Sequence, residues 1–140
     1  MKLVSKKKKN NKGFSLVELI VVVLIIAIIA VALAPQVMKW VGTAKDNVDK
    51  NNMASIKSSI QIALVEFESA GNTLKKTTIE INKTGVVVTE PSTDSVYCTK
   101  LKEKIEGVFG GSYPSPETKD SKFQVVIDTE KSNNISVSIP

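Results

Sequence analysis

The sequence contains no histidine and no arginine, and it has a single cysteine, Cys98. Without histidine, the chain lacks the commonest general base and the commonest metal ligand. One cysteine forms neither an intrachain disulfide nor a thiolate metal cluster. Arginine favours bidentate contacts to phosphates and bases, so its absence weakens a nucleic-acid-binding interpretation. We therefore expect no enzymatic activity, no cofactor and no metal site.

The net charge of +5 is confined to one end of the chain. Residues 1–12 hold six lysines and no acid, whereas 13 lysines and 14 acids follow from Phe14 onward. The basic character thus belongs to a short N-terminal segment. A nucleic-acid partner is not implied by the charge of the remainder.

A long apolar run follows these lysines. Residues 19–34 carry no polar side chain, and the run extends back to Phe14 with only Ser15 and Glu18 as interruptions. About 20 apolar residues are enough to cross a bilayer as a helix. Lysines at its start favour a cytoplasmic N-terminus, with everything after residue 40 outside.

Two simple interpretations explain this segment only in part. A secretory signal peptide would be cut after residues 32–34, but Pro35 follows that position and the run exceeds the usual apolar core of roughly 7–15 residues. A plain membrane anchor explains the length and the lysines. It leaves Glu18 unexplained, because a carboxylate in an apolar span is costly and marks a functional position.

A third interpretation comes from the junction Lys12-Gly13-Phe14-Ser15-Leu16-Val17-Glu18. This junction, with the lysines before it and the apolar run after it, resembles the leader junction of type IV prepilins and pseudopilins. The resemblance implies that a prepilin peptidase cuts after Gly13 and methylates the new N-terminal residue, Phe14. It also implies that Glu18 acts in subunit assembly. The chain departs from the family at Ala27, where a glycine is frequent.

Elementary electrostatics supplies a partner for Glu18. The cut would free a cationic amine at Phe14, and a carboxylate in a medium of low dielectric is tolerated when it is paired. Glu18 of one subunit would pair with the amine of an incoming subunit and so set its register. The amine of the same helix, four residues away, is the alternative partner.

Helical spacing continues beyond the apolar run. Apolar residues recur mostly every three or four positions, with a polar gap at 49–52; they are Val37, Val41, Ala44, Val48, Ile56, Ile60, Ala63, Phe67 and Ala70. We predict one helix from Phe14 to Ala70, roughly 85 Å long. Pro35 lacks an amide donor, so a kink is predicted there, with Gly42 as a second flexible point. Gly71 is expected to stop the helix.

Beyond residue 71 the apolar period changes to two, which is typical of strands. The expected elements are strands at 78–81 and 86–89 around a turn at 82–85, a short helix capped by Asp94 and ending at Gly107, a loop at 110–121, and strands at 123–127 and 135–139 around a turn at 130–134. Cys98 is expected to be a small buried residue of the short helix, with an intermolecular disulfide as the alternative.

The predicted fold class is α+β, a type IV pilin-like ladle in which a long kinked N-terminal helix packs on a small antiparallel sheet of about four strands. The resemblance implies that residues 1–13 form a basic leader that is removed. Residues 14–70 form the helix, with 14–38 as the transmembrane and filament-core part and 39–70 packed on the globular domain. Residues 71–140 form the β-rich globular region.

By resemblance, the chain is expected to be a structural subunit of a type IV pilus that serves adhesion, twitching motility or biofilm formation. A pseudopilin of a type II secretion or competence DNA-uptake system is the alternative, and a membrane-anchored binding module is the third. The implied partners are other copies of the chain, prepilin peptidase, the assembly platform with its ATPase, and the cytoplasmic membrane. The precursor would cross that membrane once, and the assembled subunit would be extracellular.

Overall fold

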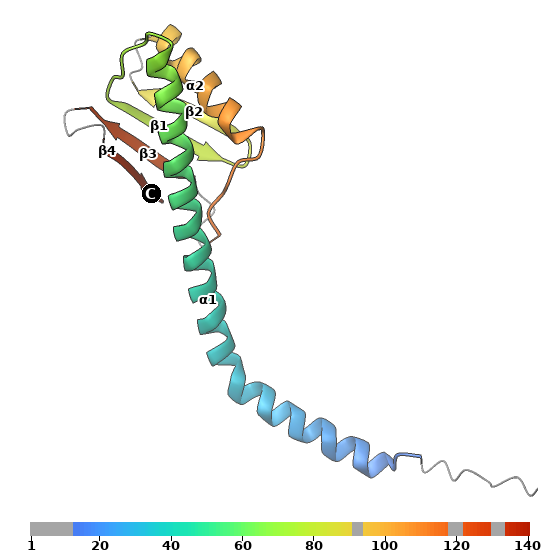
Figure 1. Ribbon diagram of the computed structural model, residues 1–140. Coiled ribbons are helices and arrows are strands. Elements are labelled where there is room, and N and C mark those ends of the chain that lie inside the picture. The colour runs from blue at the N-terminus through green and yellow to red at the C-terminus, as the bar shows by residue number, and fades with distance from the viewer. Residues whose placement is uncertain (1–12, 91–93, 118–121, 130–133) are drawn as a thin grey trace, which may run out of the picture. The chain divides into compact units, whose positions relative to one another are not determined.

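The structure is a computed structural model, and it describes residues 13–90, 94–117, 122–129 and 134–140. The elements in chain order are helix α1 (Leu16–Ser69), strands β1 (Thr77–Asn82) and β2 (Gly85–Glu90), helix α2 (Ser95–Phe109), and strands β3 (Phe123–Asp128) and β4 (Asn134–Ser138) (Figure 1). The chain divides into two units, Met1–Trp40 and Val41–Pro140.

The described part of the first unit is the N-terminal portion of α1 and the short segment before it. Gly13 to Ser15 are not helical, and from Leu16 to Trp40 every residue is helical and exposed. Pro35 lies inside the helix without ending it. The predicted helix from 14 to 70 is thus confirmed to within two residues at each end. Kinks at Pro35 and Gly42 stay predictions.

The second unit begins with the C-terminal portion of α1, which ends where the sequence predicted. Gly71 adopts the left-handed conformation, with φ of 80°. Its N–H donates to the carbonyl of Glu68 at 2.9 Å. The side-chain amide of Asn72 donates to the carbonyl of Phe67 at 3.0 Å. These bonds satisfy carbonyls that a helix end leaves without partners.

The four strands form one antiparallel sheet in the order β2-β1-β3-β4. The predicted strands and the hairpin between β1 and β2 are confirmed. Asn82 holds the hairpin turn, because its side-chain oxygen accepts from the N–H groups of Thr84 at 2.9 Å and Gly85 at 3.1 Å. The predicted turn at 130–134 lies almost entirely outside the described residues.

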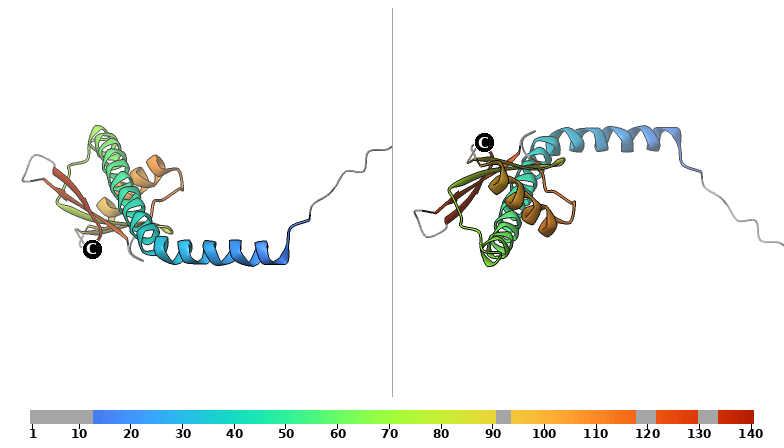
Figure 2. Two further views of the ribbon diagram at one scale, coloured as in Figure 1. Left: turned by 90° about the horizontal axis from the view of Figure 1, so that it is seen from below. Right: turned by 90° about the horizontal axis from the view of Figure 1, so that it is seen from above.

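One hydrophobic core joins both helices of the second unit to the sheet. It contains Ile56, Ile60, Ala63, Leu64 and Phe67 of α1, Tyr97, Leu101 and Ile105 of α2, and Ile79, Ile81, Val86, Phe123, Val125, Ile127 and Ile135 of the strands. In β1 and β3 every second residue is buried, as the period of two predicted. Figure 2 shows α2 and β4 on opposite sides of α1.

Helix α2 differs from the prediction at its C-terminal end. It continues past Gly107 to Phe109, and Gly110 closes it with φ of 59° and an N–H that donates to the carbonyl of Glu106 at 3.0 Å. Val108 and Phe109 both pack against the core. The packing of these two side chains stabilises the longer helix, so Gly107 remains helical. The prediction that the helix stops at Gly107 is wrong.

Candidate processing and assembly site

The predicted cleavage junction lies just before the first turn of α1. Gly13 and Phe14 precede the helix, and the Phe14 side chain is 85% exposed. A Cβ atom placed on Gly13 would meet no atom within 4 Å. The fold of the chain therefore sets no steric requirement for glycine at this position. Any such requirement must come from another molecule.

Glu18 lies in the first turn of α1, and its carboxylate accepts a hydrogen bond from the residue that precedes the helix. Its Oε2 accepts from the backbone N–H of Ser15 at 2.8 Å. The Ser15 carbonyl in turn accepts the N–H of Leu19 at 3.1 Å. A serine before the helix and a glutamate at its third position form the back-bonded half of a capping box. In the uncut chain, Glu18 thus satisfies an orphan donor of its own helix.

This capping bond was not among the predictions for Glu18. The junction motif predicted that Glu18 pairs with the amine that cleavage would create at Phe14, either on a neighbouring subunit or on the same helix. That amine does not exist in the uncut chain, and the helix start supplies a third partner. The spacing Ser-x-x-Glu before an apolar run was the signal that would have found it.

The helix that follows exposes its apolar side chains along its whole first part. From Leu16 to Trp40 the large apolar residues are between 47% and 78% exposed. An 18-residue window of this helix has a mean hydropathy of 3.4, and none of it is buried. Length and composition suffice to cross a membrane, although a signal sequence meets the same test. Such a surface needs lipid or other protein chains to cover it.

Comparison with known proteins identifies this N-terminal region. Residues 8–34 match the family described as the prokaryotic N-terminal methylation motif. Over 134 residues the chain is 33% identical to Prepilin peptidase-dependent protein A of Clostridium perfringens (strain 13 / Type A), covering 94% of this chain and 88% of that protein. The chain belongs to the type IV pilin and pseudopilin family. No solved structure matches the chain.

Membership of this family explains why the chain has a long exposed apolar helix. The helix fits the membrane anchor of a prepilin-type precursor, and the motif points to a structural subunit. The match over residues 8–34 contains Gly13, Phe14 and Glu18. The structure brings these three residues together at one end of α1.

Pro35 and Gly42 lie farther along the same helix and outside the matched motif. Gly42 is exposed, and a Cβ atom there would meet nothing within 4 Å. Neither residue contacts the cleavage junction, from which several helical turns separate them. The structure thus shows no packing reason for glycine at position 42.

Asp49 is a buried residue that was not among the predicted core or site residues. It was placed in a polar gap of the helix, yet it is only 2% exposed. Its Oδ1 accepts from the backbone N–H of Glu117 at 2.7 Å, which ties the segment after α2 to α1. Asp49 lies seven residues before Ile56, hence on the same helix face as the core. That spacing was the available signal.

A polar cluster fixes the start of α2 to the segment before β1. Asp94 caps the helix by accepting from the Tyr97 N–H at 3.0 Å, as predicted, and its other oxygen bonds the Lys75 ammonium at 2.7 Å. The Tyr97 hydroxyl lies 2.9 Å from the Thr77 hydroxyl. The Tyr97 ring meets the Phe67 ring edge-on, with centroids 5.3 Å apart. The cluster therefore links both helices to the sheet.

The charges of this cluster shift each other's proton affinity. The hydrogen bond from Lys75, followed by the one from the Tyr97 N–H, lowers the pKa of Asp94 below its ordinary 3.8. The same hydrogen bond, aided by the negative charge of Asp94, raises the pKa of Lys75 above 10.5. Both side chains are partly exposed, so water screens the attraction.

The residues that the structure describes offer no metal-binding group. Within 13–90, 94–117, 122–129 and 134–140, no three His, Cys, Asp or Glu side chains lie close enough together to hold an ion. Cys98 is half-buried against the core and forms no disulfide. The prediction of a buried small residue on α2 is thus correct in its location and partly correct in its burial.

Proposed function

We propose that the chain is a structural subunit of a type IV pilus, held in the cytoplasmic membrane as a precursor and assembled into a surface filament. The observation that carries the proposal is the contrast between a complete core after residue 56 and an entirely exposed apolar helix before residue 40. Lipid covers that helix in the precursor, and the helices of other subunits cover it in the filament.

Prepilin peptidase removes residues 1–13 and methylates Phe14 in this proposal. Three observations support it: the matched methylation motif, the name of the similar Clostridium perfringens protein, and the exposed, non-helical junction. A non-helical junction with an exposed side chain after the cleavage position suits entry into a protease. Because a Cβ atom at Gly13 would meet no other atom of the chain within 4 Å, we attribute the need for glycine to the peptidase rather than to the fold.

Glu18 changes partner during assembly. In the stored subunit its carboxylate accepts from the Ser15 N–H, so it is not left without a partner at the membrane. After cleavage and entry into the filament, it pairs with the methylated Phe14 amine of a neighbouring subunit. An ion pair gains strength in the apolar surroundings of packed helices, whereas a lone carboxylate there is penalised. The exchange therefore seats the next subunit in one register.

The transfer of the subunit from the membrane to the filament requires an assembly platform and an ATPase. Lipid and helix surfaces are about equally apolar, so the transfer between them releases little free energy. An assembly platform with an ATPase supplies the work of extraction. The filament acts at the cell surface in adhesion, twitching motility or biofilm formation.

The test is an intact-mass measurement on protein purified from its native cells. The mature chain should lack residues 1–13, start at Phe14 and carry one additional methyl group, and surface filaments sheared from the cells should contain it. Gly13→Leu is the matched control, because it leaves the fold unaffected and should retain the leader. A wild-type chain that begins at Met1 would instead be a plain anchor, and one that begins at Pro35 would have been cut as a secretory signal.

A further inference from the structure

The exposed apolar surface of α1 ends at a sharp boundary. From Leu16 to Val41 every large apolar side chain is at least 47% exposed. No residue between Glu18 and Lys39 carries a charge. Beyond the boundary, charged side chains return at positions 45, 46, 49 and 50. The surface that needs a cover of lipid or protein therefore ends within two residues of Trp40.

Trp40 is the largest side chain at this boundary. It is 64% exposed, and among the residues that the structure describes it is neither part of the hydrophobic core nor packed against it. A large ring left in water gives up the free energy that burial of its apolar area would supply. Its indole N–H, on the other hand, needs a polar partner. An environment that is apolar on one side and wet on the other meets both requirements.

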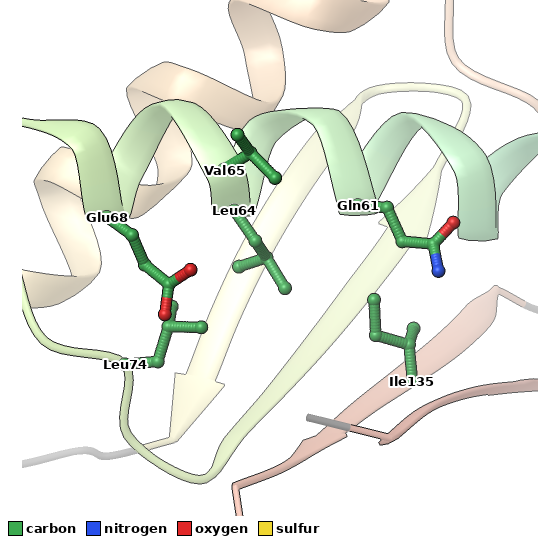
Figure 3. Close-up of a pocket in the computed structure, with 6 residues that line it drawn as sticks. All are labelled: Gln61, Leu64, Val65, Glu68, Leu74 and Ile135. Carbon is green, nitrogen blue, oxygen red and sulfur yellow. The ribbon is translucent and has the colours of Figure 1, made fainter. Parts of the chain in front are cut away.

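In the second unit, by contrast, exposed apolar side chains lie among polar ones. A groove of about 230 Å³ between α1 and β4 is lined by Gln61, Leu64, Val65, Glu68, Leu74 and Ile135. Figure 3 shows the amide of Gln61 and the carboxylate of Glu68 on the same helix as Leu64 and Val65. Leu64 is only 4% exposed, whereas Val65 is 65% exposed. Apolar side chains flanked by polar ones are ordinary on a surface that faces water, so this unit needs no lipid cover.

The distance from Glu18 to Trp40 matches the apolar thickness of a bilayer. Both residues belong to one continuous helix, and the helix between them is roughly 33 Å long at about 1.5 Å per residue. The hydrocarbon core of a bilayer is about 30 Å thick. With Glu18 at the cytoplasmic surface, Trp40 reaches the headgroup layer of the opposite leaflet. A small tilt of the helix takes up the excess length.

We propose that Trp40 anchors the precursor in the headgroup layer of the outer leaflet of the cytoplasmic membrane. The partner is a phospholipid surface: the ring lies against the upper acyl chains, and the indole N–H donates to phosphate or ester oxygens. The anchor marks where α1 leaves the membrane, and it opposes movement of the helix across the bilayer. The proposal rests on the membrane-held precursor of the proposed function.

Trp40 itself supplies the first measurement, because it is the only tryptophan in the chain. The full-length chain is placed in phosphatidylcholine vesicles whose acyl chains carry bromine either close to the headgroup or close to the chain end. Bromine close to the headgroup should quench the Trp40 fluorescence about twofold more strongly. The matched control is Trp40→Phe with Ile29→Trp, which moves the indole to the middle of the span, and there the order of quenching should reverse.

Loss of the anchor provides a second readout in the same vesicles. Cys98→Ser removes the native cysteine, and Gly42→Cys places a thiol at an exposed position where a Cβ atom meets nothing within 4 Å. A membrane-impermeant maleimide labels those thiols that face the vesicle exterior. Trp40→Ala should slow this labelling about threefold or more, because the helix then moves deeper into the bilayer.

Two control variants show whether this change comes from the anchor. Trp40→Tyr should keep the original labelling rate at position 42, since tyrosine also combines an apolar ring with a polar tip. Lys83→Cys, at the exposed β1–β2 turn, should be labelled at one rate whichever residue stands at position 40.

The outcomes separate the anchor from the proposed function. Equal quenching at both bromine depths, or labelling at position 42 that does not respond to Trp40→Ala, would overturn the anchor. Loss of surface filaments in Trp40→Ala together with such a result would make Trp40 a contact between subunits instead. None of the vesicle measurements needs cleavage or assembly, so a native chain that begins at Met1 would overturn the pilus subunit and leave the anchor in place.

Discussion

Helix α1 is one continuous helix whose two parts have opposite relations to the rest of the chain. Residues 16–40 are the more apolar part, and none of them is buried. Residues 41–69 carry more polar side chains, yet five apolar residues and Asp49 are buried against the sheet and its loops. Apolar content and burial within the chain therefore run in opposite directions along the same helix.

This contrast shows that hydrophobicity alone does not locate the core of the molecule. The second part of α1 gains its stability from packing on its own sheet. The apolar side chains of the first part are exposed among the residues that the structure describes, so their free energy depends on lipid or on other subunits. Substitutions in the two parts should consequently affect different measurements, assembly in one case and unfolding in the other.

The largest expected effect is on assembly, at Glu18. Glu18→Gln keeps an oxygen that accepts from the Ser15 N–H but removes the charge that pairs with an amine. Loss of one partner of a desolvated ion pair should lower the filament yield about a hundredfold or more, while cleavage at Gly13 continues. Sheared filaments are measured by immunoblot, and cleavage by intact mass.

Glu18→Ala is the companion variant, since it removes both the charge and the capping acceptor. It should also be processed and should assemble no better than Glu18→Gln. Normal filaments from Glu18→Gln would show that capping of the helix, not ion pairing, is the role of this glutamate.

A pair of alanine substitutions tests the contrast directly. Phe67→Ala removes a ring that is 1% exposed and should lower the free energy of unfolding by about 3–5 kcal/mol. Leu24→Ala changes a side chain that is 58% exposed and should leave that free energy unchanged. Denaturant titration of the full-length chain in detergent is the measurement. Equal destabilisation by both substitutions would show that the two parts of the helix fold as one unit.

A smaller loss is expected at Asp49. Asp49→Ala removes the acceptor of the Glu117 N–H and should lower the free energy of unfolding by about 1–3 kcal/mol. Asp46→Ala, one turn earlier and exposed, is the matched control and should stay within about 0.5 kcal/mol of wild type. Increased proteolysis between α2 and β3 in Asp49→Ala alone would locate the effect in the tied segment. An unchanged cleavage rate there would contradict the tie.

The smallest effect is a dependence on pH at Asp94. Its pKa is lowered in the folded chain, so the pair with Lys75 stabilises the fold at neutral pH, and this contribution disappears as the pH falls below 3.8 and through the lowered pKa. At the alkaline end it disappears as the pH rises above 10.5 and through the raised pKa of Lys75.

Asp94→Asn isolates this contribution, because asparagine is also a good cap but carries no charge. Thermal unfolding should show wild type slightly more stable than the variant near pH 7, with the difference vanishing in acid. A constant difference across the acid range would mean that the cap alone, and not the ion pair, matters.

The sequence predicted those features that depend on local pattern. The period of the apolar residues and the residues Gly71, Asn82 and Asp94 were enough to place both helices, all four strands and most of their ends. The end of α2 was missed because glycines at 107, 110 and 111 could all end the helix, and only the packing of Val108 and Phe109 on the core decides between them. Local signals do not contain that information.

Long-range contacts account for the other omissions. Asp49 bonds a backbone N–H that is 68 residues away, and every residue type except proline carries such a group. Leu64 is buried because β4 lies beside it, which follows only from the sheet order. At Glu18 a local signal was present, because Ser15 and Glu18 have the spacing of a capping box. The family resemblance predicted only the amine released by cleavage as a partner, and so the capping bond of the uncut chain was not predicted.

The strand order has a consequence for how the subunit is made. The β1–β2 hairpin forms from neighbouring residues and closes as soon as it is synthesised, whereas β1 waits for β3 and the groove waits for β4. Ile135 of β4 lines the groove between that strand and α1. A chain that lacks β4 thus lacks one wall of this groove and leaves Leu64 uncovered.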